Sequence, residues 1–205
     1  MARNAGLMID IGTGDGRAVL RAARNAPDHL VIGVDPNAGA MAVASRRAAR
    51  GGMLNALFLA ASLESLPSEL AGRAGLVRVT LPWGSLLRGL LADDPATHAA
   101  VSVLVAPGGR LELFLSLTER DRPAGAALMS RSGRAILSRA AMRGILRRFQ
   151  GFTVEEMRPA TAADVVSSGS SWAKRLEIPG RREAWIGRLR RGFPREGRTV
   201  SAPGD

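Results

Sequence analysis

Short apolar runs alternate with segments of helical periodicity along the first 117 residues. Apolar runs bounded by turn residues predict buried strands, and apolar positions spaced three and four apart predict helices. The predicted strands are residues 7–11, 30–34, 55–60, 75–81 and 110–117. The predicted helices are residues 17–25, 39–50, 85–91 and 96–105. This alternation is typical of a parallel sheet with helices on both faces.

The pattern changes after residue 117. Residues 118–133 are polar and contain glycine and proline, so they predict a loop. The remaining predicted elements are a helix at 135–149, a strand at 152–157, a short helix at 160–166, a serine–glycine segment at 167–171 and a strand at 182–189. The predicted fold class is therefore α/β and Rossmann-like, with a seven-stranded sheet whose last two strands form a hairpin. This is the methyltransferase variant of the doubly wound fold.

Composition excludes several classes of site. The chain has no cysteine, so it predicts neither disulfides nor thiolate metal ligands. His29 and His98 lie far apart in the sequence, which disfavours a zinc site. No apolar run reaches the roughly 18 residues of a membrane span. We expect a soluble cytoplasmic protein without a metal, acting as a monomer.

Positive charge is concentrated in the last third of the chain. Residues 1–130 carry 13 arginines and 11 acidic residues, a net charge of +2. Residues 131–198 carry 15 arginines and one lysine against six acidic residues, a net charge of +10. Such asymmetry favours a surface that docks on a polyanion such as nucleic acid, although a solvated charged face is the alternative.

A glycine-rich loop with two acidic residues follows the first strand. Gly12, Gly14 and Gly16 let the backbone turn tightly and approach a ligand. Asp10 and Asp15 would repel a pyrophosphate, but they suit the positively charged amino end of S-adenosylmethionine.

Polar residues also follow the second and third strands. Asp35 could accept hydrogen bonds from ribose hydroxyls, and Ser62 and Glu64 follow the strand end near which an adenine would lie. The alternatives are a nucleotide-binding dehydrogenase and a plain tight turn. The residues predicted to bind the cofactor are Asp10, Gly12, Thr13, Gly14, Asp15, Asp35, Ala61, Ser62, Glu64, Leu81 and Ser85.

The residues of the loop after the fourth predicted strand, 80–85, indicate which kind of substrate atom would be methylated. It contains Leu81, Pro82 and Trp83 in place of the Asn/Asp-Pro-Pro-aromatic sequence with which amino-methylating enzymes hold an exocyclic amine. A ring nitrogen such as adenine N1 has its own lone pair, so it needs orientation rather than a general base. Trp83 and Trp172 are candidates for stacking on a flipped base, and Trp185 is expected in the core.

Two of these segments resemble those of a known family. Residues 81–89 and 171–176 are similar to the signature loops of the 16S rRNA (adenine-1408-N1)-methyltransferases, the kanamycin–apramycin resistance enzymes. The glycine loop, Asp35-Pro36 and residues 64–67 also match. The resemblance covers about residues 7–190 and implies a 16S rRNA substrate in the 30S subunit.

The resemblance also implies roles for individual residues. Trp83 and Trp172 would sandwich the flipped adenine, the Pro82 backbone would line the cofactor, and Ser171 would help order the second tryptophan loop. Three of these residues, Trp83, Trp172 and Pro82, are the predicted catalytic group. The predicted RNA-binding residues are Arg46, Arg47, Arg50, Ser171, Lys174, Arg175, Arg181 and Arg182.

The predicted activity is therefore methylation of adenine 1408 at N1, conferring aminoglycoside resistance. We expect one domain over 1–192, with RNA-facing segments at 118–133 and 160–182, and a disordered tail at 193–205. Two alternatives stay open at this point. One is a methyltransferase acting on another RNA or on a small molecule, and the other is a catalytically weak RNA-binding homologue.

Overall fold

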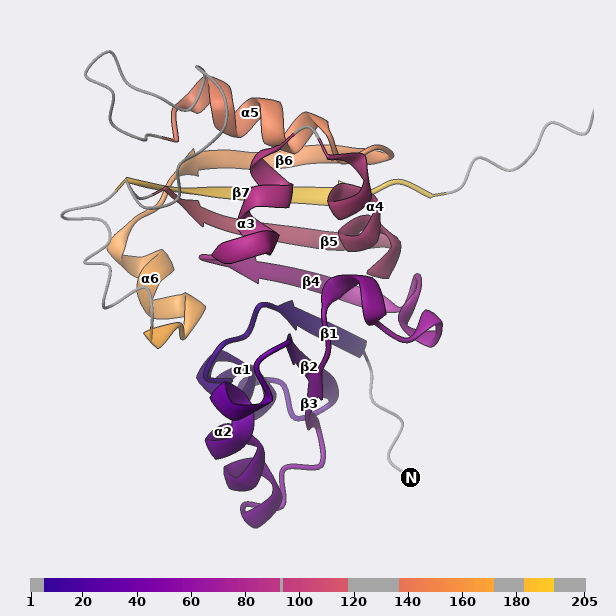
Figure 1. Ribbon diagram of the computed structural model, residues 1–205, viewed down its shortest axis with the longest axis vertical. Coiled ribbons are helices and arrows are strands. Elements are labelled where there is room, and N and C mark those ends of the chain that lie inside the picture. The colour runs from indigo at the N-terminus through magenta and orange to yellow at the C-terminus, as the bar shows by residue number, and fades with distance from the viewer. Residues whose placement is uncertain (1–5, 93, 118–136, 172–182, 194–205) are drawn as a thin grey trace, which may run out of the picture.

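The computed structural model describes residues 6–92, 94–117, 137–171 and 183–193. Its seven strands form one sheet in the order β3-β2-β1-β4-β5-β7-β6 (Figure 1). The strands are β1 (Gly6–Ile11), β2 (His29–Asp35), β3 (Ala56–Ala60), β4 (Ala74–Thr80), β5 (Val105–Ser116), β6 (Phe152–Pro159) and β7 (Ala184–Arg191). Only β7 runs antiparallel to its neighbours, β5 and β6. The predicted sheet and its terminal hairpin are thereby confirmed.

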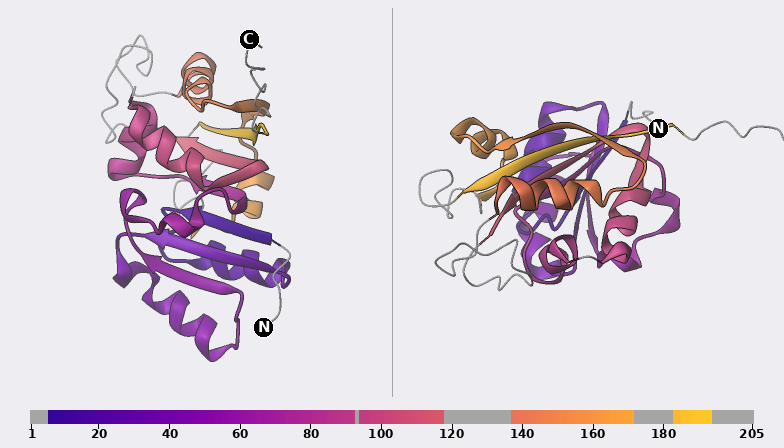
Figure 2. Two further views of the ribbon diagram at one scale, coloured as in Figure 1. Left: turned by 90° about the vertical axis from the view of Figure 1, so that its right-hand side faces the viewer. Right: turned by 90° about the horizontal axis from the view of Figure 1, so that it is seen from above.

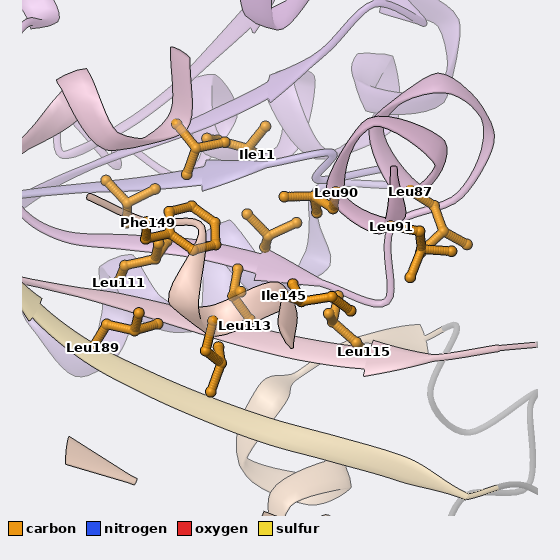
Figure 3. Close-up of a cluster of buried hydrophobic side chains, with 14 of the residues drawn as sticks. Ile11, Leu87, Leu90, Leu91, Leu111, Leu113, Leu115, Ile145, Phe149 and Leu189 are labelled. Atoms are coloured by element: carbon orange, nitrogen blue, oxygen red, sulfur yellow. The ribbon is translucent and has the colours of Figure 1, made fainter. Parts of the chain in front are cut away.

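Helices cover both faces of the sheet (Figure 2). They are α1 (Arg17–Asn25), α2 (Ala38–Arg50), α3 (Gly84–Leu91), α4 (Pro95–Leu104), α5 (Arg139–Arg147) and α6 (Ala162–Ser168), with 3-10 turns η1 (Leu63–Ser65) and η2 (Ser68–Leu70). The main core lies between the sheet and α3, α4 and α5 (Figure 3). A second cluster packs α1 and α2 against the opposite face, and a third packs α6 there.

Several element bounds differ from the prediction, and two of the differences have a clear physical reason. β5 begins at Val105, which pairs with Ala74, and an irregularity in register accommodates the turn residues that follow. α5 begins at Arg139 because the side chain of Ser138 accepts the N–H of Ala141, which caps the helix. β7 begins at Ala184, two residues later than expected. Trp185 within it is 9% exposed, which confirms its place in the core.

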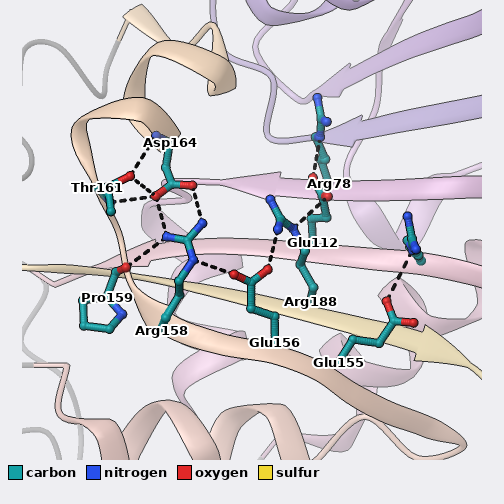
Figure 4. Close-up of polar contacts among 10 residues, drawn as sticks. Arg78, Glu112, Glu155, Glu156, Arg158, Pro159, Thr161, Asp164 and Arg188 are labelled. Carbon is teal, nitrogen blue, oxygen red and sulfur yellow. Dashed lines mark hydrogen bonds and ion pairs between the residues drawn. The ribbon is translucent and has the colours of Figure 1, made fainter.

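Alternating charges cross the α6-side face of the sheet (Figure 4). The strand register places Arg78 beside Glu112, Glu112 beside Arg188, and Arg188 beside Glu156. Arg78 Nε lies 2.9 Å from Glu112 Oε2, and Arg188 Nε lies 3.2 Å from Glu112 Oε1. Arg188 also pairs with Glu156, whose other oxygen accepts from Arg158. We call this row of ion pairs, Arg78 to Arg158, the charge ladder.

Candidate active site

The carboxyl ends of β1, β2, β3 and β4 meet at one edge of the sheet and surround a cavity. The cavity has a volume of about 270 Å³ and is lined by residues from the loop after each of these strands. Ligands of doubly wound sheets bind at this edge, so the topology alone marks it as the candidate site. The lining includes Gly12 after β1, Asp35 after β2, Ser62 and Glu64 after β3, and Pro82, Trp83 and Ser85 after β4.

The glycine loop after β1 reaches the cavity through Gly12. Gly12 has a positive φ of 71°, and its N–H donates to the carbonyl of Val34 at 2.8 Å, which binds the loop to the end of β2. Gly16 also has a φ of 71°, and a Cβ there would lie 2.6 Å from the ring of Phe58. Glycine is therefore required both by backbone conformation and by close packing at the start of α1.

Asp35 stands at the cavity wall with both carboxylate oxygens already accepting backbone N–H groups. Oδ2 accepts from Gly14 at 2.9 Å, and Oδ1 accepts from Asn37 at 2.9 Å. These bonds hold the carboxylate in one orientation. Since each carboxylate oxygen can accept two hydrogen bonds, Asp35 keeps capacity for ligand hydroxyls.

Asp10 lies behind the cavity wall rather than on it. Its carboxylate is 3% exposed and accepts a hydrogen bond of 2.7 Å from the hydroxyl of Thr13. Burial raises the pKa of Asp10 to about 6, against the lowering effects of Thr13 and of the Arg78 charge. The carboxylate is thus buried and mostly ionised at neutral pH, and no cation among the described residues is bonded to it.

Asp15 is directed away from the cavity, toward the end of α6. Its Oδ2 accepts a hydrogen bond of 2.7 Å from the hydroxyl of Ser171, and its Oδ1 accepts from the N–H of Arg17 at 3.2 Å. Ser171 is half-buried and directly precedes Trp172 in the sequence. The glycine loop and the segment after α6, separated by 156 residues, are therefore joined.

The loop after β4 presents Trp83 at the mouth of the cavity. Leu81 is buried and has a φ of 48°, a conformation that costs a non-glycine residue roughly 1–2 kcal/mol, and its N–H donates to the carbonyl of Phe114 at 2.7 Å. Trp83 is 73% exposed at the start of α3, so it is not a core residue. Strained backbone beside an exposed aromatic ring is the kind of arrangement found at ligand sites.

The predicted cofactor residues divide into two groups. Gly12, Asp35, Ala61, Ser62, Glu64 and Ser85 line the cavity, as do the predicted catalytic residues Pro82 and Trp83. The other predicted cofactor residues, Asp10, Thr13, Gly14, Asp15 and Leu81, are not among the residues that line it. The prediction missed Thr97, which α4 contributes to the wall. No local signal identifies Thr97, because only the packing of α4 beside α3 brings it there.

The predicted RNA-binding residues fall partly within the described structure. Arg46, Arg47 and Arg50 are exposed on α2. Trp172, Lys174, Arg175, Arg181 and Arg182 lie outside the described residues. So do the predicted RNA-facing segment 118–133, residues 172–182 of the other one, and residues 194–205 of the predicted tail.

The described parts of the chain offer neither a metal cluster nor a membrane span. Among residues 6–92, 94–117, 137–171 and 183–193, no three His, Asp or Glu side chains are grouped so as to hold a metal ion. Within these ranges, every helix is too short or too polar to span a membrane.

The sheet order and the cavity define a class I, Rossmann-like methyltransferase. The chain belongs to the family of 16S rRNA (adenine(1408)-N(1))-methyltransferases, because the family model named NpmA matches residues 1–190. The fold and family expected from the sequence are thus confirmed.

Individual relatives agree with this assignment. A 16S rRNA (adenine(1408)-N(1))-methyltransferase of Streptoalloteichus tenebrarius is 37% identical over 115 residues, which are 54% of this chain and 53% of the relative. The chain thus matches about half the length of that relative. The Escherichia coli protein of the same name is 28% identical over 186 residues, which are 87% of this chain and 83% of the relative.

Solved structures extend the similarity over nearly the whole chain. A tryptophan-to-alanine mutant of the 16S rRNA (adenine(1408)-N(1))-methyltransferase from Catenulisporales acidiphilia, solved with its cosubstrate SAM, has a TM-score of 0.77 at 28% identity. That match covers 96% of this chain and 90% of the other. The antibiotic-resistance methyltransferase Kmr has a TM-score of 0.68 at 35% identity, covering 93% of this chain and 89% of the other.

Proposed function

We propose that this protein methylates N1 of adenine 1408 in the 16S rRNA of the 30S subunit, with S-adenosylmethionine as methyl donor. The observation that carries the proposal is an exposed tryptophan, Trp83, at the mouth of a cofactor-sized cavity in a chain of this family. The modified base would carry an added methyl group and positive charge on the edge that aminoglycosides bind. Resistance to kanamycin and apramycin is the expected consequence in a cell.

The residues around the cavity fit S-adenosylmethionine. Asp35 retains acceptor capacity for ribose hydroxyls, and Ser62 and Glu64 line the part of the cavity where adenine would lie. Asp10 supplies a buried negative charge without a directly bonded cation, which suits the positively charged amino end of this ligand. The bound cosubstrate supplies an electrophilic methyl group on a sulfonium.

The reaction at a ring nitrogen needs no general base. The N1 lone pair forms the new N–C bond, the electron pair of the broken C–S bond stays on sulfur, and the positive charge moves to the adenine. The task of the protein is therefore to hold the base in line with the methyl group. Trp83 would stack on the flipped base, and Trp172 would stack on its other face. The Pro82 backbone, on the cavity wall, would line the cofactor.

Docking on the subunit would use cationic residues outside the cavity. Arg46, Arg47 and Arg50 are exposed on α2. Lys174, Arg175, Arg181 and Arg182 would contact phosphates around the target base. We propose that Ser171 acts indirectly, because its hydroxyl is bound to Asp15 of the glycine loop and so sets where the Trp172 segment begins. We further propose that the protein acts as a monomer without a metal.

Primer extension on 30S subunits treated with protein and S-adenosylmethionine tests the proposal. The expected result is a stop at adenine 1408. Trp83→Ala should reduce the methylation rate roughly 10- to 100-fold, because stacking of a base on an aromatic ring contributes about 1–3 kcal/mol. Trp83→Phe keeps a ring and is the matched variant, expected to retain most activity. Calorimetry should show cofactor affinity unchanged within about twofold in both variants.

Two results would contradict the proposal. Cofactor binding without a stop at this adenine would exclude the target, and methyl transfer to total RNA or to a metabolite extract would then identify another substrate. Absence of both cofactor binding and methyl transfer would instead favour an RNA-binding homologue without catalysis.

A further inference from the structure

The arginines of the basic last third are used in two different ways. Eight of them lie in the described ranges 137–171 and 183–193. Three of the eight, Arg158, Arg188 and Arg190, pair with carboxylates on the sheet, and Arg158 also pairs with Asp164 of α6. Arg148 and Arg191 donate to backbone carbonyls, the former to Leu91 and the latter to Ser102. The remaining three arginines are all on α5.

These three, Arg139, Arg143 and Arg147, form a row along the exposed side of α5. Their spacing of four residues places them on neighbouring turns of one face, about 6 Å apart along the helix axis. All three are exposed, while Met142, Ile145 and Leu146 on the opposite side are buried in the core. We call this set the α5 arginine row.

The α5 arginine row has no carboxylate partner among the described residues. No ion pair joins any of the three to an acidic group there, and α5 itself contains no Asp or Glu. Like charges four residues apart destabilise a helix by about 0.2–0.5 kcal/mol per pair. Since the row contains two such pairs, α5 carries a charge pattern that works against its own stability.

The residues beside the row are small. Ala140 and Gly144 are exposed and adjoin Arg139 and Arg143. A Cβ at Gly144 would meet nothing within 4 Å, so packing inside the protein does not require glycine. Glycine nevertheless costs a helix interior about 0.8–1.0 kcal/mol relative to alanine. The exposed face of α5 is thus open to close approach of a partner and is not optimised for helix stability.

We propose that the α5 arginine row binds the phosphate backbone of RNA, as a docking surface distinct from α2. This inference rests on the proposed function, which brings the protein to a large RNA. An evenly spaced row of planar guanidinium forks suits successive phosphates, each of which can accept two parallel hydrogen bonds. A polyanion would also relieve the repulsion within the row. An acidic protein surface is the competing partner and is separated from RNA by the experiment below.

The fold places the row where one RNA could reach both it and the site. α5 connects β5 to β6, which point the same way, so the helix starts near the carboxyl edge that carries the cavity. Arg139 is therefore the member of the row nearest that edge. Figure 1 shows α5 and α2 at opposite ends of the sheet. The two helices would bind RNA on either side of the target base.

The test measures the affinity for 30S subunits as a function of salt. The variant is the double substitution Arg139→Gln with Arg143→Gln. The matched control is Arg24→Gln with Arg73→Gln, because these two arginines are also exposed, form no ion pair among the described residues, and change the net charge equally. Each lost phosphate contact should reduce the slope of log affinity against log salt by about 0.7–0.9. We expect the slope to fall by about 1.5 in the row variant and to stay unchanged in the control.

Further readouts separate docking from a structural role. At near-physiological salt the row variant should bind subunits roughly 5- to 30-fold more weakly, while kcat at saturating subunits and the affinity for S-adenosylmethionine stay unchanged. Its melting temperature should equal or exceed that of the parent, because repulsion within α5 is reduced. A second double variant, Arg139→Gln with Arg143→Lys, keeps one of the two charges and should retain part of the salt slope.

Several outcomes would overturn the inference. If the row variant binds subunits with unchanged affinity and salt slope, the row is only a solvated surface. If the control variant loses as much affinity as the row variant, the effect comes from net charge alone. Weaker binding to subunits with undiminished binding to naked 16S rRNA would assign the row to a protein partner. Failure of the proposed function looks different: the parent protein would bind RNA with the same salt slope but leave adenine 1408 unmethylated.

Discussion

Two aspartates, Asp10 behind the cavity wall and Asp164 on α6, both expose little surface, but their pKa values shift in opposite directions. Asp10 is 3% exposed and Asp164 is 7% exposed. Burial raises the pKa of Asp10 to about 6. The Arg158 guanidinium holds the pKa of Asp164 well below its usual range, with bonds of 2.6 and 2.7 Å to the two carboxylate oxygens. For Asp10 burial outweighs the hydrogen bond from Thr13, whereas for Asp164 the hydrogen bonds from Arg158 outweigh burial.

The difference separates a structural carboxylate from one suited to a ligand. Asp164 also accepts from the N–H and hydroxyl of Thr161, both at 2.7 Å, so its acceptor capacity is largely used by the protein (Figure 4). Asp10 receives one hydroxyl from Thr13, and its neighbour Arg78 is paired with Glu112 instead. The fold thus places a cation against the acid that supports α6, whereas among the described residues no cation is bonded to Asp10.

The largest expected effect is opposite changes in stability when the two aspartates are neutralised. Asp10→Asn should raise the free energy of unfolding at pH 8 by up to about 3 kcal/mol, because burial raises the pKa of Asp10 to about 6 and so penalises its ionised form in the folded protein. Asp164→Asn should lower it by about 2 kcal/mol, because Arg158 loses the more buried of its two carboxylate partners. Urea unfolding measures both.

The pH dependence of those changes checks their cause. Because the pKa of Asp10 is raised in the folded state, its ionisation destabilises the folded protein, and this effect is complete above about pH 6. The gain in the free energy of unfolding of Asp10→Asn should therefore vanish near pH 4. A lowered pKa means that the stabilisation by Asp164 is complete above its unfolded pKa and is lost at lower pH. The deficit of Asp164→Asn should therefore shrink below about pH 4. Equal signs for the two variants at pH 8 would contradict the comparison.

Removing the cation from Asp164 should be nearly as costly as neutralising the acid. Arg158→Met leaves a buried carboxylate without its guanidinium, and we expect a loss of about 2 kcal/mol in urea unfolding after allowing for the partial exposure of Arg158. Arg190→Met is the matched control, since its pair with Glu155 is more exposed and should contribute about 0–1 kcal/mol. Comparable losses in the two variants would show that burial of Asp164 has no special consequence.

The affinity for S-adenosylmethionine should fall as Asp10 takes up a proton. With a pKa of about 6, the carboxylate is mostly ionised at pH 7 and mostly protonated at pH 5. Calorimetry should show affinity about tenfold weaker at pH 5 than at pH 7, which corresponds to about 1.4 kcal/mol. The same titration in Asp10→Asn should be nearly flat. A parent protein with pH-independent affinity would remove Asp10 from cofactor binding.

The smallest effect is expected from Thr13→Val. This change deletes the hydroxyl that donates to Asp10, so it should cost about 0.5–1.5 kcal/mol at pH 8. It should also move the midpoint of the pH-dependent affinity upward, because the hydrogen bond stabilises the ionised form. Thr80→Val, on a strand of the same sheet but without a bond to Asp10, is the control. A downward shift would contradict the assigned role of Thr13.

The net charge of the last third of the sequence overstated how many of its arginines are available to bind RNA. The net charge of +10 over residues 131–198 suggested one basic docking face. In the described part of that region, Arg158, Arg188 and Arg190 instead pair with carboxylates of the sheet and of α6. Their partners depend on strand register, which composition does not contain.

The candidate site was predictable in part. Gly12, Asp35, Glu64 and Trp83 follow their strands at positions that a parallel sheet brings to one edge, and the structure places all four around one cavity. Asp15 was predicted as a cofactor ligand from its place in the glycine loop. The structure shows its carboxylate bonded to Ser171, a contact across 156 residues that no local pattern indicates.

The sequence by itself determined the elements and the order of the site loops. Periodicity sets which residues face a core, and glycines with positive φ, such as Gly12, set the turns, because both effects act within a few residues. Only the tertiary structure decided which charges meet. Asp164 finds Arg158, and Asp10 finds no such partner among the residues that the structure describes, because packing of distant elements sets distances between side chains. Electrostatic interactions follow those distances and the burial around them.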